Sequence, residues 1–586
     1  MLSLPSQSTR ADSATWKANP SNNSWNDAAN WTPETVPNGP ADVATFNTSS
    51  ITSVFLSDIE VSEIVFNPGA SSFTITADPL YVFTISGPGI INNSGVTQQF
   101  IADQSLLTPD TQPIQFINSA TAGSGTVFKA LGGIDEDGSG GGKIEFFDTS
   151  SADHASFEIF DAAAPAEAGP GELIFNPGST AANASFIVHG GVNLHDPGIL
   201  SFDGASASEA VITNLGGVVS FGDGADAGNS TITNNGPGVT TFDSTSTAAQ
   251  ASITNNGGSF SGDLRIGHTG FTGTATAGAA TITNEGGNGA GAAAGSTSFS
   301  DTSTAGSATL IANAGVDGGA GASISFYDSS DGGTERVQVF GNATLDISGA
   351  SSGLGPTIGS LEGDGMVMLG VNSLTIGSAN LNTSFAGLIQ GTGTATKAGT
   401  GVLTLSGANS FTGGMSVNQG TLVVSNTFGS GTGAGRVQVN AGTLGGSGIV
   451  SGPVTLGTGS GIGAFLAPAH GTNTQATLTI QSALTFSADS TYTCTFKAKR
   501  NRAKMDQVIA NGVTINSGAS FAFQGFAQGT LRQGLVLTVI SNTSVRPIAG
   551  TFSNLPDGAI LTVNGNNFQA SYEGGSGNDL TLTVVQ

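Results

Sequence analysis

The tripeptide Ile-Thr-Asn recurs through the middle of this chain and constrains its fold more than any other feature. The leading isoleucines of successive copies are separated by steps of 20, 21, 29 and 29 residues. A period in this range is typical of stacked supersecondary units, none of which can bury its apolar face alone. The copies are Ile212–Asn214, Ile232–Asn234, Ile253–Asn255 and Ile282–Asn284, followed by a faded copy at Ile311–Asn313.

Each repeat holds two short β-type runs and no helix signal. One run carries Ile-Thr, and the other ends in an aromatic residue, as in Val239–Phe242. Both are rich in β-branched residues and bounded by Asn, Gly or Asp, which is typical of strands, and the segment Asn234–Gly236 suits a turn. Two strands per repeat predict an all-β, parallel β-solenoid. The competing β-propeller needs a period of about 40–50 residues.

The charge balance narrows the function classes. Charged residues make up 10% of the chain, and 41 acidic against 15 basic residues give a net charge of −26. A low charge suits stacked coils, because equivalent side chains lie about 5 Å apart and columns of like charge repel. Nucleic acid is not expected as a partner, because a phosphate track needs a basic surface. A single cysteine excludes an intramolecular disulfide framework.

No run of about 18 apolar residues occurs, so no membrane-spanning helix is expected. Residues 1–11 lack an apolar core, but Thr9–Ala11 has the form of a cleavage site ahead of Asp12. We expect residues 1–11 to be a leader or a signal remnant, with a disordered leader as the alternative.

Residues 391–424 read GTGTATKAGTGVLTLSGANSFTGGMSVNQGTLVV. This segment resembles the autotransporter-associated β-strand repeat. Three further segments are similar to the ends of such secreted bacterial proteins: Ser24–Asn38, Ser490–Val508 and Tyr572–Leu582. The resemblance implies an extracellular or surface-displayed right-handed parallel β-helix with an N-terminal cap and a C-terminal β-rich capping region. The expected organisation is a leader at 1–11, a cap and first coils at 12–100, degenerate coils at 101–390, autotransporter-associated coils at 391–470, and a C-terminal β region at 471–586.

All three tryptophans fall within the first 31 residues. Trp25 and Trp31 could stack on sugar rings, which makes them candidate glycan contacts. The alternative is that they cover the open end of the solenoid, where core and strand edges are exposed.

Neither catalysis nor a resident cofactor is expected. The histidines lack metal-ligand spacing, and the basic residues before position 380 are widely scattered. Calcium remains open at aspartates that follow the repeat phenylalanines, because stacked carboxylates can supply its oxygen ligands. A turn-closing role for these aspartates is the simpler interpretation. They are Asp148, Asp203, Asp223, Asp243, Asp301 and Asp328.

The most distinctive local feature is a basic stretch at 497–504. Its cations are Lys497, Lys499, Arg500, Arg502 and Lys504, which are five of the fifteen basic residues of the chain. A solvated hairpin or loop is the simple interpretation. The functional one is docking onto an acidic face, either of another copy of this chain or of an extracellular anionic polymer.

These observations favour a secreted bacterial β-solenoid with a structural or adhesive role at the cell surface. Self-association into a filament or surface layer is a further expectation. The alternatives are a carbohydrate-active β-helix enzyme, such as a polysaccharide lyase or hydrolase, and a glycan-binding module without catalysis.

Overall fold

The computed structural model describes residues 12–105, 110–134, 138–163, 168–190, 196–351, 355–461, 463–470, 474–499 and 502–586. The expected leader at 1–11 therefore lies outside the described residues. The chain divides into two compact units. Unit 1 comprises Met1–Ser298 with Val316–Gly319, and unit 2 comprises Phe299–Gly315 with Ala320–Gln586.

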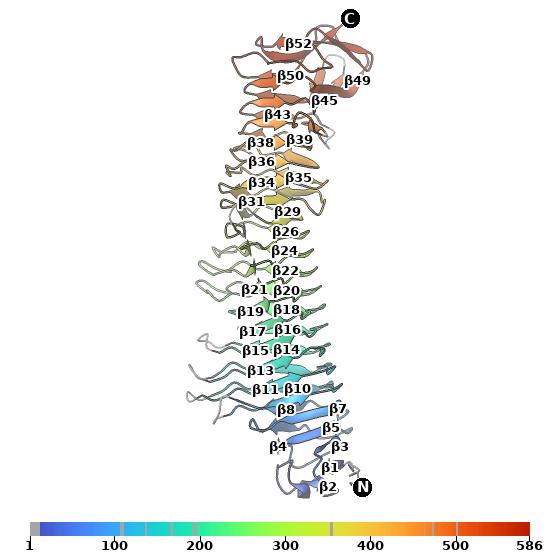
Figure 1. The fold of residues 1–586 in the computed structure, drawn as a ribbon, viewed down its shortest axis with the longest axis vertical. Coiled ribbons are helices and arrows are strands. Elements are labelled where there is room, and N and C mark those ends of the chain that lie inside the picture. The colour runs from blue at the N-terminus through green and yellow to red at the C-terminus, as the bar shows by residue number, and fades with distance from the viewer. Residues whose placement is uncertain are drawn as a thin grey trace, which may run out of the picture. The chain divides into compact units, whose positions relative to one another are not determined.

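Unit 1 is a parallel β-helix in which successive coils contribute one strand to each of two sheets (Figure 1). Strands of one sheet pair in register, so that each residue lies beside the equivalent residue of the next coil. Single bridges from Thr121 through Thr276 form a third line of coil-to-coil contacts.

The first sheet holds β1 (Ala14–Trp16), β2 (Trp31–Thr32), β3 (Gly39–Phe46), β5 (Ile59–Phe66), β7 (Phe83–Asn92), β9 (Pro113–Phe116), β11 (Lys143–Phe146), β13 (Glu172–Phe175), β15 (Ile199–Asp203), β17 (Val218–Gly222), β19 (Val239–Phe242) and β21 (His268–Phe271). The second holds β4 (Ser53–Leu56), β6 (Thr74–Ala77), β8 (Gln98–Ala102), β10 (Thr126–Ala130), β12 (Ser156–Ile159), β14 (Ser185–His189), β16 (Val211–Leu215), β18 (Thr231–Asn234), β20 (Ser252–Asn255) and β22 (Thr281–Asn284).

The parallel β-helix predicted from the repeat is confirmed, and the repeat residues form columns in its core. The phenylalanine that ends the second run of each repeat stacks on its equivalents, with ring centroids 4.6–5.0 Å apart from Phe116 to Phe271. This spacing matches the distance between neighbouring strands, so the rings of successive coils stack as a continuous column in the core.

The asparagine of Ile-Thr-Asn is a buried strand residue, which corrects its assignment to a turn. Asn234 is fully buried, and its side-chain amide donates to the Oδ1 atom of Asn255 at 2.8 Å. Asn214 donates in the same way to Asn234 at 3.0 Å, and Asn255 to Asn284 at 2.8 Å. A side-chain amide can donate a hydrogen bond to one neighbour and accept one from the other, so stacked asparagines supply hydrogen-bond partners to each other in the core. The Oδ1 atom of Asn214 has no partner because the preceding coil places Val188 beside it.

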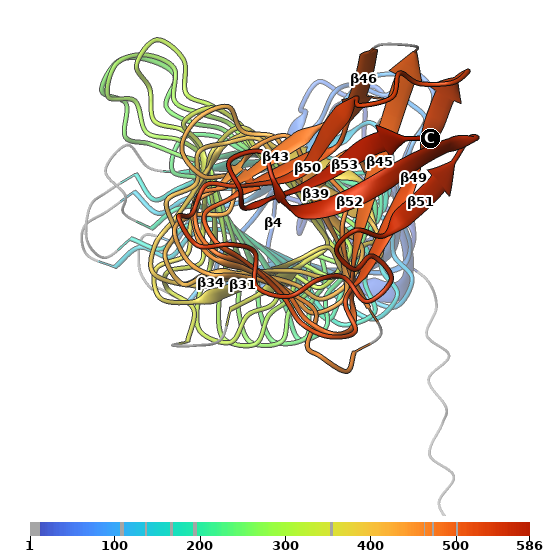
Figure 2. The same ribbon diagram turned by 90° about the horizontal axis from the view of Figure 1, so that it is seen from above.

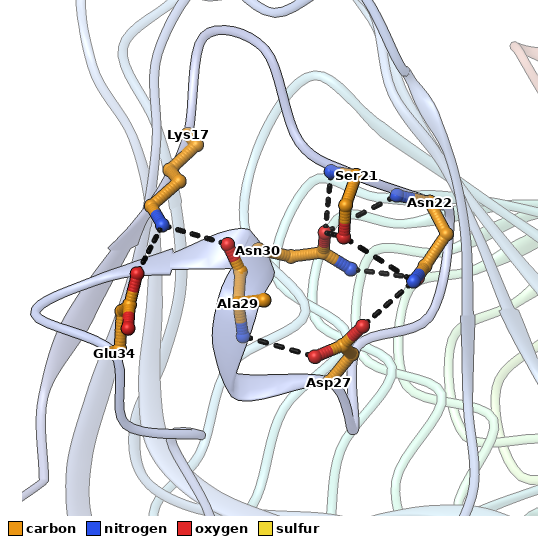
Figure 3. A network of polar contacts seen from close by, with 7 residues as sticks. All are labelled: Lys17, Ser21, Asn22, Asp27, Ala29, Asn30 and Glu34. Atoms are coloured by element: carbon orange, nitrogen blue, oxygen red, sulfur yellow. Dashed lines mark hydrogen bonds and ion pairs between the residues drawn. The ribbon is translucent and has the colours of Figure 1, made fainter.

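The first residues of the β-helix form a compact cap around a tryptophan cluster. β2 pairs with β1 in antiparallel orientation, and the other edge of β1 pairs in parallel with β3. The short 3-10 helix η1 (Ala28–Asn30) leads into β2. Asn30 is fully buried, where its Oδ1 atom accepts from the backbone and hydroxyl of Ser21, and its Nδ2 atom donates to the Oδ1 atom of Asn22 (Figure 3). The cap thus covers the strand edge of the first coil.

The ring centroids of Trp31 lie 5.1 Å from Trp16 and 4.9 Å from Trp25, and all three indoles pack on Phe46. Trp25 and Trp31 are each 0% exposed. Their indole nitrogens donate to the carbonyl oxygens of Pro37 and Trp25, respectively. Neither ring therefore offers a face on which a sugar could stack, so their assignment as glycan contacts is at odds with this burial. The physical reason is that the open end of the solenoid needs a large apolar cover.

Unit 2 is also a parallel β-helix, with four sheets among its described residues. Sheet 1 holds β25 (Ser323–Phe326), β27 (Thr344–Asp346), β30 (Met366–Met368) and β33 (Leu388–Gln390), and β23 (Ser296–Phe299) spans the boundary of the two units. Sheet 2 holds β24 (Thr309–Ala312), β26 (Arg336–Val339), β29 (Ser360–Gly363), β32 (Thr383–Phe385), β35 (Val402–Leu405), β37 (Thr421–Val424), β39 (Gly442–Gly446), β42 (Ala464–Leu466), β45 (Ser490–Lys499), β46 (Arg502–Met505) and β49 (Ser520–Gln528). Sheet 3 holds β28 (Thr357–Ile358), β31 (Ser373–Ile376), β34 (Thr394–Lys397), β36 (Met415–Val417), β38 (Val437–Val439), β41 (Val454–Leu456), β44 (Leu484–Phe486) and β48 (Val513–Ile515). Sheet 4 holds β40 (Ile449–Val450), β43 (Thr477–Ile480), β47 (Gln507–Ala510), β50 (Val536–Asn542), β53 (Asp579–Val585), β52 (Asn566–Gly574) and β51 (Ile560–Val563).

Lys397, within the segment that resembles the autotransporter-associated repeat, has a structural role. It is 1% exposed and lies in register between Ile376 and Val417. Its alkyl stem replaces an aliphatic side chain of the column. Its ammonium donates to the carbonyl oxygens of Ala398, Gly399 and Gln419, and burial lowers its pKa to about 8.

The pairing changes at the C-terminal part of unit 2. β50, β53, β52 and β51 pair antiparallel, unlike the parallel coils before them. Figure 2 shows β45, β46, β49, β51 and β52 gathered on one side of these coils. This extension carries the basic stretch identified in the sequence.

Candidate functional site: a cationic β-ribbon

The basic stretch lies on strands, because β45 continues for ten residues with strict alternation. Phe496 and Ala498 are buried, whereas Lys497 and Lys499 are exposed. Successive side chains of a strand point to opposite faces, so the two lysines share the outer face. Arg500, the fifth cation of the basic stretch, lies outside the described residues.

Three strands place the cations in two rows. β46 pairs antiparallel with the end of β45, with Lys504 beside Lys497 and Arg502 beside Lys499. β49 pairs with the other edge of β45 and adds Phe526 to the first row and Gln528 to the second. We call this surface the cationic ribbon, comprising β46 with residues 496–499 of β45 and 525–528 of β49. Directly paired side chains lie about 5 Å apart, so the four described cations occupy one small area.

The inner face fixes the ribbon in place. The ring of Phe496 stacks on Phe523 at 4.6 Å and meets Phe568 of β52 edge-on at 5.5 Å. At the base of the hairpin, the buried carboxylate of Asp506 accepts hydrogen bonds from the backbone and hydroxyl of Thr495, each at 2.8 Å. A packed aromatic face and a buried acceptor hold the backbone, so the cations are presented on a rigid support.

Five cations outside the ribbon form ion pairs with described residues, unlike three of the ribbon cations. Among the described residues, ion pairs engage Lys17, Lys129, Lys143, Arg265 and Arg336. No ion pair of the described residues engages Lys499, Arg502 or Lys504. Neighbouring cations at this spacing repel by about 1 kcal/mol per pair in water. Lys499, Arg502 and Lys504 thus form a concentrated positive surface that no ion pair of the described residues engages, in a chain with a large excess of carboxylates.

A shallow groove of about 290 Å³ runs along the ribbon. The four cations line it together with Phe526, whose side chain is 61% exposed. These cations can form charge-assisted hydrogen bonds with an anionic ligand, and the ring of Phe526 adds an aromatic face beside them.

The structure brings Lys497, Lys499, Arg502 and Lys504 together on one face, as their sequence proximity indicates. The sequence did not point to Phe526 or Gln528. The segment Ser520–Gln528 reads as an ordinary core strand, and only its pairing with β45 shows that its last residues leave the core.

The aspartates considered for calcium lie at the ends of strands or just after them, and Asp203 is the last residue of β15. Asp148, Asp223, Asp301 and Asp328 have positive φ angles of 45–56°. The carboxylate of Asp148 accepts from the backbone N–H of Asn118 in the preceding coil. Within the described part of the chain, no three His, Cys, Asp or Glu side chains gather closely enough to hold a metal ion. Calcium binding at these aspartates stays a prediction.

Cys494, on the same strand as the ribbon lysines, is fully buried, and burial raises the pKa of its thiol. A buried, protonated thiol is a core residue rather than a nucleophile. Within the described segments, no helix is long and apolar enough to cross a membrane.

Two comparisons with known proteins bear on this chain. Residues 396–424 match the family described as Passenger-associated-transport-repeat. The chain is also 35% identical over 182 residues to the "Adhesin BmaC autotransporter" of Brucella suis biovar 1 (strain 1330). That alignment covers 28% of this chain and 5% of the relative, so the chain corresponds to a small part of that protein. The resemblance read from residues 391–424 is thereby confirmed, and this parallel β-helix carries a repeat of the autotransporter passenger type.

Proposed function

We propose that this chain is an extracellular adhesive β-helix whose cationic ribbon docks onto the acidic surface of a second copy. The observation that carries the proposal is the cluster of Lys499, Arg502 and Lys504, which no ion pair of the described residues engages, in a chain of net charge −26. The passenger-type repeat and the similarity to part of an adhesin support a position outside the cell.

Charge complementarity favours another copy as the partner. The chain has 41 acidic residues, so a second copy offers anionic surface at the same concentration as the ribbon itself. Attraction between opposite patches raises the rate of encounter and selects the docking register. The exposed ring of Phe526 supplies apolar contact at the edge of the positive area. Such an interface joins two different surfaces, so it can propagate from copy to copy.

The test is sedimentation velocity over a range of protein concentrations, with electron microscopy of the same samples. The ribbon variant combines Lys499→Glu, Arg502→Glu and Lys504→Glu, and we expect it to remain monomeric where the wild type associates. All three side chains are exposed, so the fold should persist, which far-UV circular dichroism checks.

The matched control reverses three exposed arginines that lie outside the ribbon and engage in no ion pair of the described residues. They are Arg436, Arg532 and Arg546. This variant has the same net charge as the ribbon variant, and we expect it to associate like the wild type. A wild type that stays monomeric, or equal losses in both variants, would refute self-docking through the ribbon. Ribbon-dependent binding of a polyanionic polysaccharide by a monomeric chain would assign the ribbon to a polymer instead.

A further inference from the structure

Unit 1 has a groove of about 320 Å³ beside β4, where β4, β6 and β8 end. Leu56, Ala77 and Ala102 lie in register across these three strands. The residues that follow them, Ser57, Asp78 and Asp103, therefore stack one coil apart, at about 4.8 Å. Two carboxyl groups thus line one side of the groove on neighbouring coils.

An aromatic side chain also lines the groove, on a strand that is hydrogen-bonded to the cap. Phe55 projects outward from β4 and is 48% exposed. Its backbone N–H donates to the carbonyl oxygen of Asn23, and its carbonyl accepts from the N–H of Trp25. Asn26, the next residue, makes two hydrogen bonds to the backbone of Ser57, at 2.7 and 3.1 Å. The backbone of Phe55 and Ser57 is therefore anchored to the cap.

The polar groups of the groove retain capacity to accept hydrogen bonds. The carboxylate of Asp78 accepts from the N–H of Leu80, and that of Asp103 from the N–H of Gln104, each at 3.0 Å. A carboxylate has about four acceptor positions, so both can take further donors. Burial raises the pKa of Asp103, and the charge of Asp78 adds to the effect. No lysine or arginine is among the described residues that line the groove.

We infer that this groove binds a neutral saccharide, with a sugar ring on Phe55 and its hydroxyl groups donating to Asp78 and Asp103. An aromatic face suits the apolar C–H side of a pyranose, and ionised carboxylates form strong hydrogen bonds with hydroxyl donors. The volume is near the lower end of the range for ligand sites and suits one or two sugar rings. The negative charge disfavours uronic acids and phosphorylated or sulfated sugars.

This inference goes beyond the proposed function and does not depend on the cationic ribbon. The two can fail separately, because the groove lies in unit 1 and the ribbon in unit 2. A chain with a reversed ribbon charge should still bind saccharide, and a chain with an altered groove should still self-associate.

The experiment is an array of neutral, amino and acidic glycans probed with the full chain, followed by calorimetry on the best neutral ligand. We expect binding to neutral glycans, little change with added salt, and a weakening of about tenfold for Phe55→Ala. Asp103→Asn should weaken binding, and the double variant with Asp78→Asn should weaken it further, because both acceptor charges are then removed. The control is Phe526→Ala, which removes a ring that is 61% exposed, against 48% for Phe55, and should leave glycan binding unchanged.

Three results would overturn the inference. The first is the absence of binding to any neutral glycan. The second is binding that is unaffected by Phe55→Ala and by the double Asp variant. The third is preferential binding of a lysine-rich peptide that disappears as salt is raised, which would assign the groove to a cationic protein segment.

Discussion

Replacing Glu335 by glutamine should change how the stability of unit 2 depends on pH. Glu335 directly precedes β26, and it lies between Ala308 of the preceding coil and Gly359 of the next. Its side chain is fully buried. One carboxyl oxygen accepts from the N–H of Gly359 at 3.3 Å, and the other has no partner. Gly332 leaves room for that oxygen, because a Cβ atom there would lie 2.1 Å from it.

Burial raises the pKa of Glu335 from 4.5 to about 8. Below pH 4.5 the carboxyl group is protonated in both the folded and the unfolded chain, so it does not lower the free energy of unfolding. Between pH 4.5 and 8 unfolding releases a proton, and the wild type loses stability by up to about 1.4 kcal/mol per pH unit. The loss is complete above pH 8, where it amounts to about 5 kcal/mol.

Glu335→Gln retains the shape of the side chain and cannot ionise. We expect its stability relative to the wild type to rise steadily from pH 5 to pH 8 and then to level off. Urea denaturation followed by far-UV circular dichroism gives the free energies. Hydrogen exchange of the β26 and β29 amides reports the same difference locally, which matters because the coils of a solenoid can unfold separately.

Glu362→Gln is the matched control, for which the stability difference from the wild type should depend on pH with the opposite sign. Glu362 forms two hydrogen bonds with Arg336, at 2.7 and 2.6 Å, and these lower its pKa. Its contribution is present above the ordinary carboxyl pKa and is lost as pH falls through the lowered value. A difference between Glu335→Gln and the wild type that stays constant from pH 5 to pH 9 would refute the burial argument.

Three further substitutions test the core and the cap by urea denaturation. Asn234→Ala interrupts the asparagine column and should cost about 1–3 kcal/mol, whereas Asn235→Ala, which lies outside it, should cost much less; equal costs would contradict the ladder. Lys397→Met keeps the alkyl stem but leaves three backbone carbonyls without their donor, and should also cost about 1–3 kcal/mol; an unchanged midpoint would show that these contacts are not needed. Trp31→Ala should destabilise the cap by about 3–5 kcal/mol and expose the first coils to limited proteolysis; an unchanged cleavage pattern would argue against capping by this residue.

The repeat allowed the fold to be predicted because stacking makes sequence periodicity and spatial columns equivalent. Each coil places its Ile-Thr-Asn beside the previous one, so the recurrence of the motif directly reports a parallel ladder. Its asparagine was nevertheless assigned to a turn. Asparagine favours turns when considered alone, but a column of asparagines pairs with itself and can therefore be buried.

The cations of the candidate site were found because they are neighbours in the sequence, whereas Phe526 was not. Lys497 and Phe526 are separated by a whole coil and meet only because β45 and β49 are in register. The same holds for the saccharide groove, whose Phe55 and Asp103 come from different coils. Trp25 and Trp31 show the converse case, since the sequence allowed either a glycan contact or an end cap and their burial agrees with the cap.

The sequence by itself determined the parallel coils, the low charge, the passenger-type repeat and the location of the basic stretch. Each of these properties is local or periodic, so it can be read along the chain. Only the tertiary structure decided which residues face outward and which share a column. It also placed Glu335 in the core, at a position that neighbouring coils fill with Ala308 and Gly359. These outcomes depend on the register between coils, which is set by backbone pairing and by the length of each connecting loop.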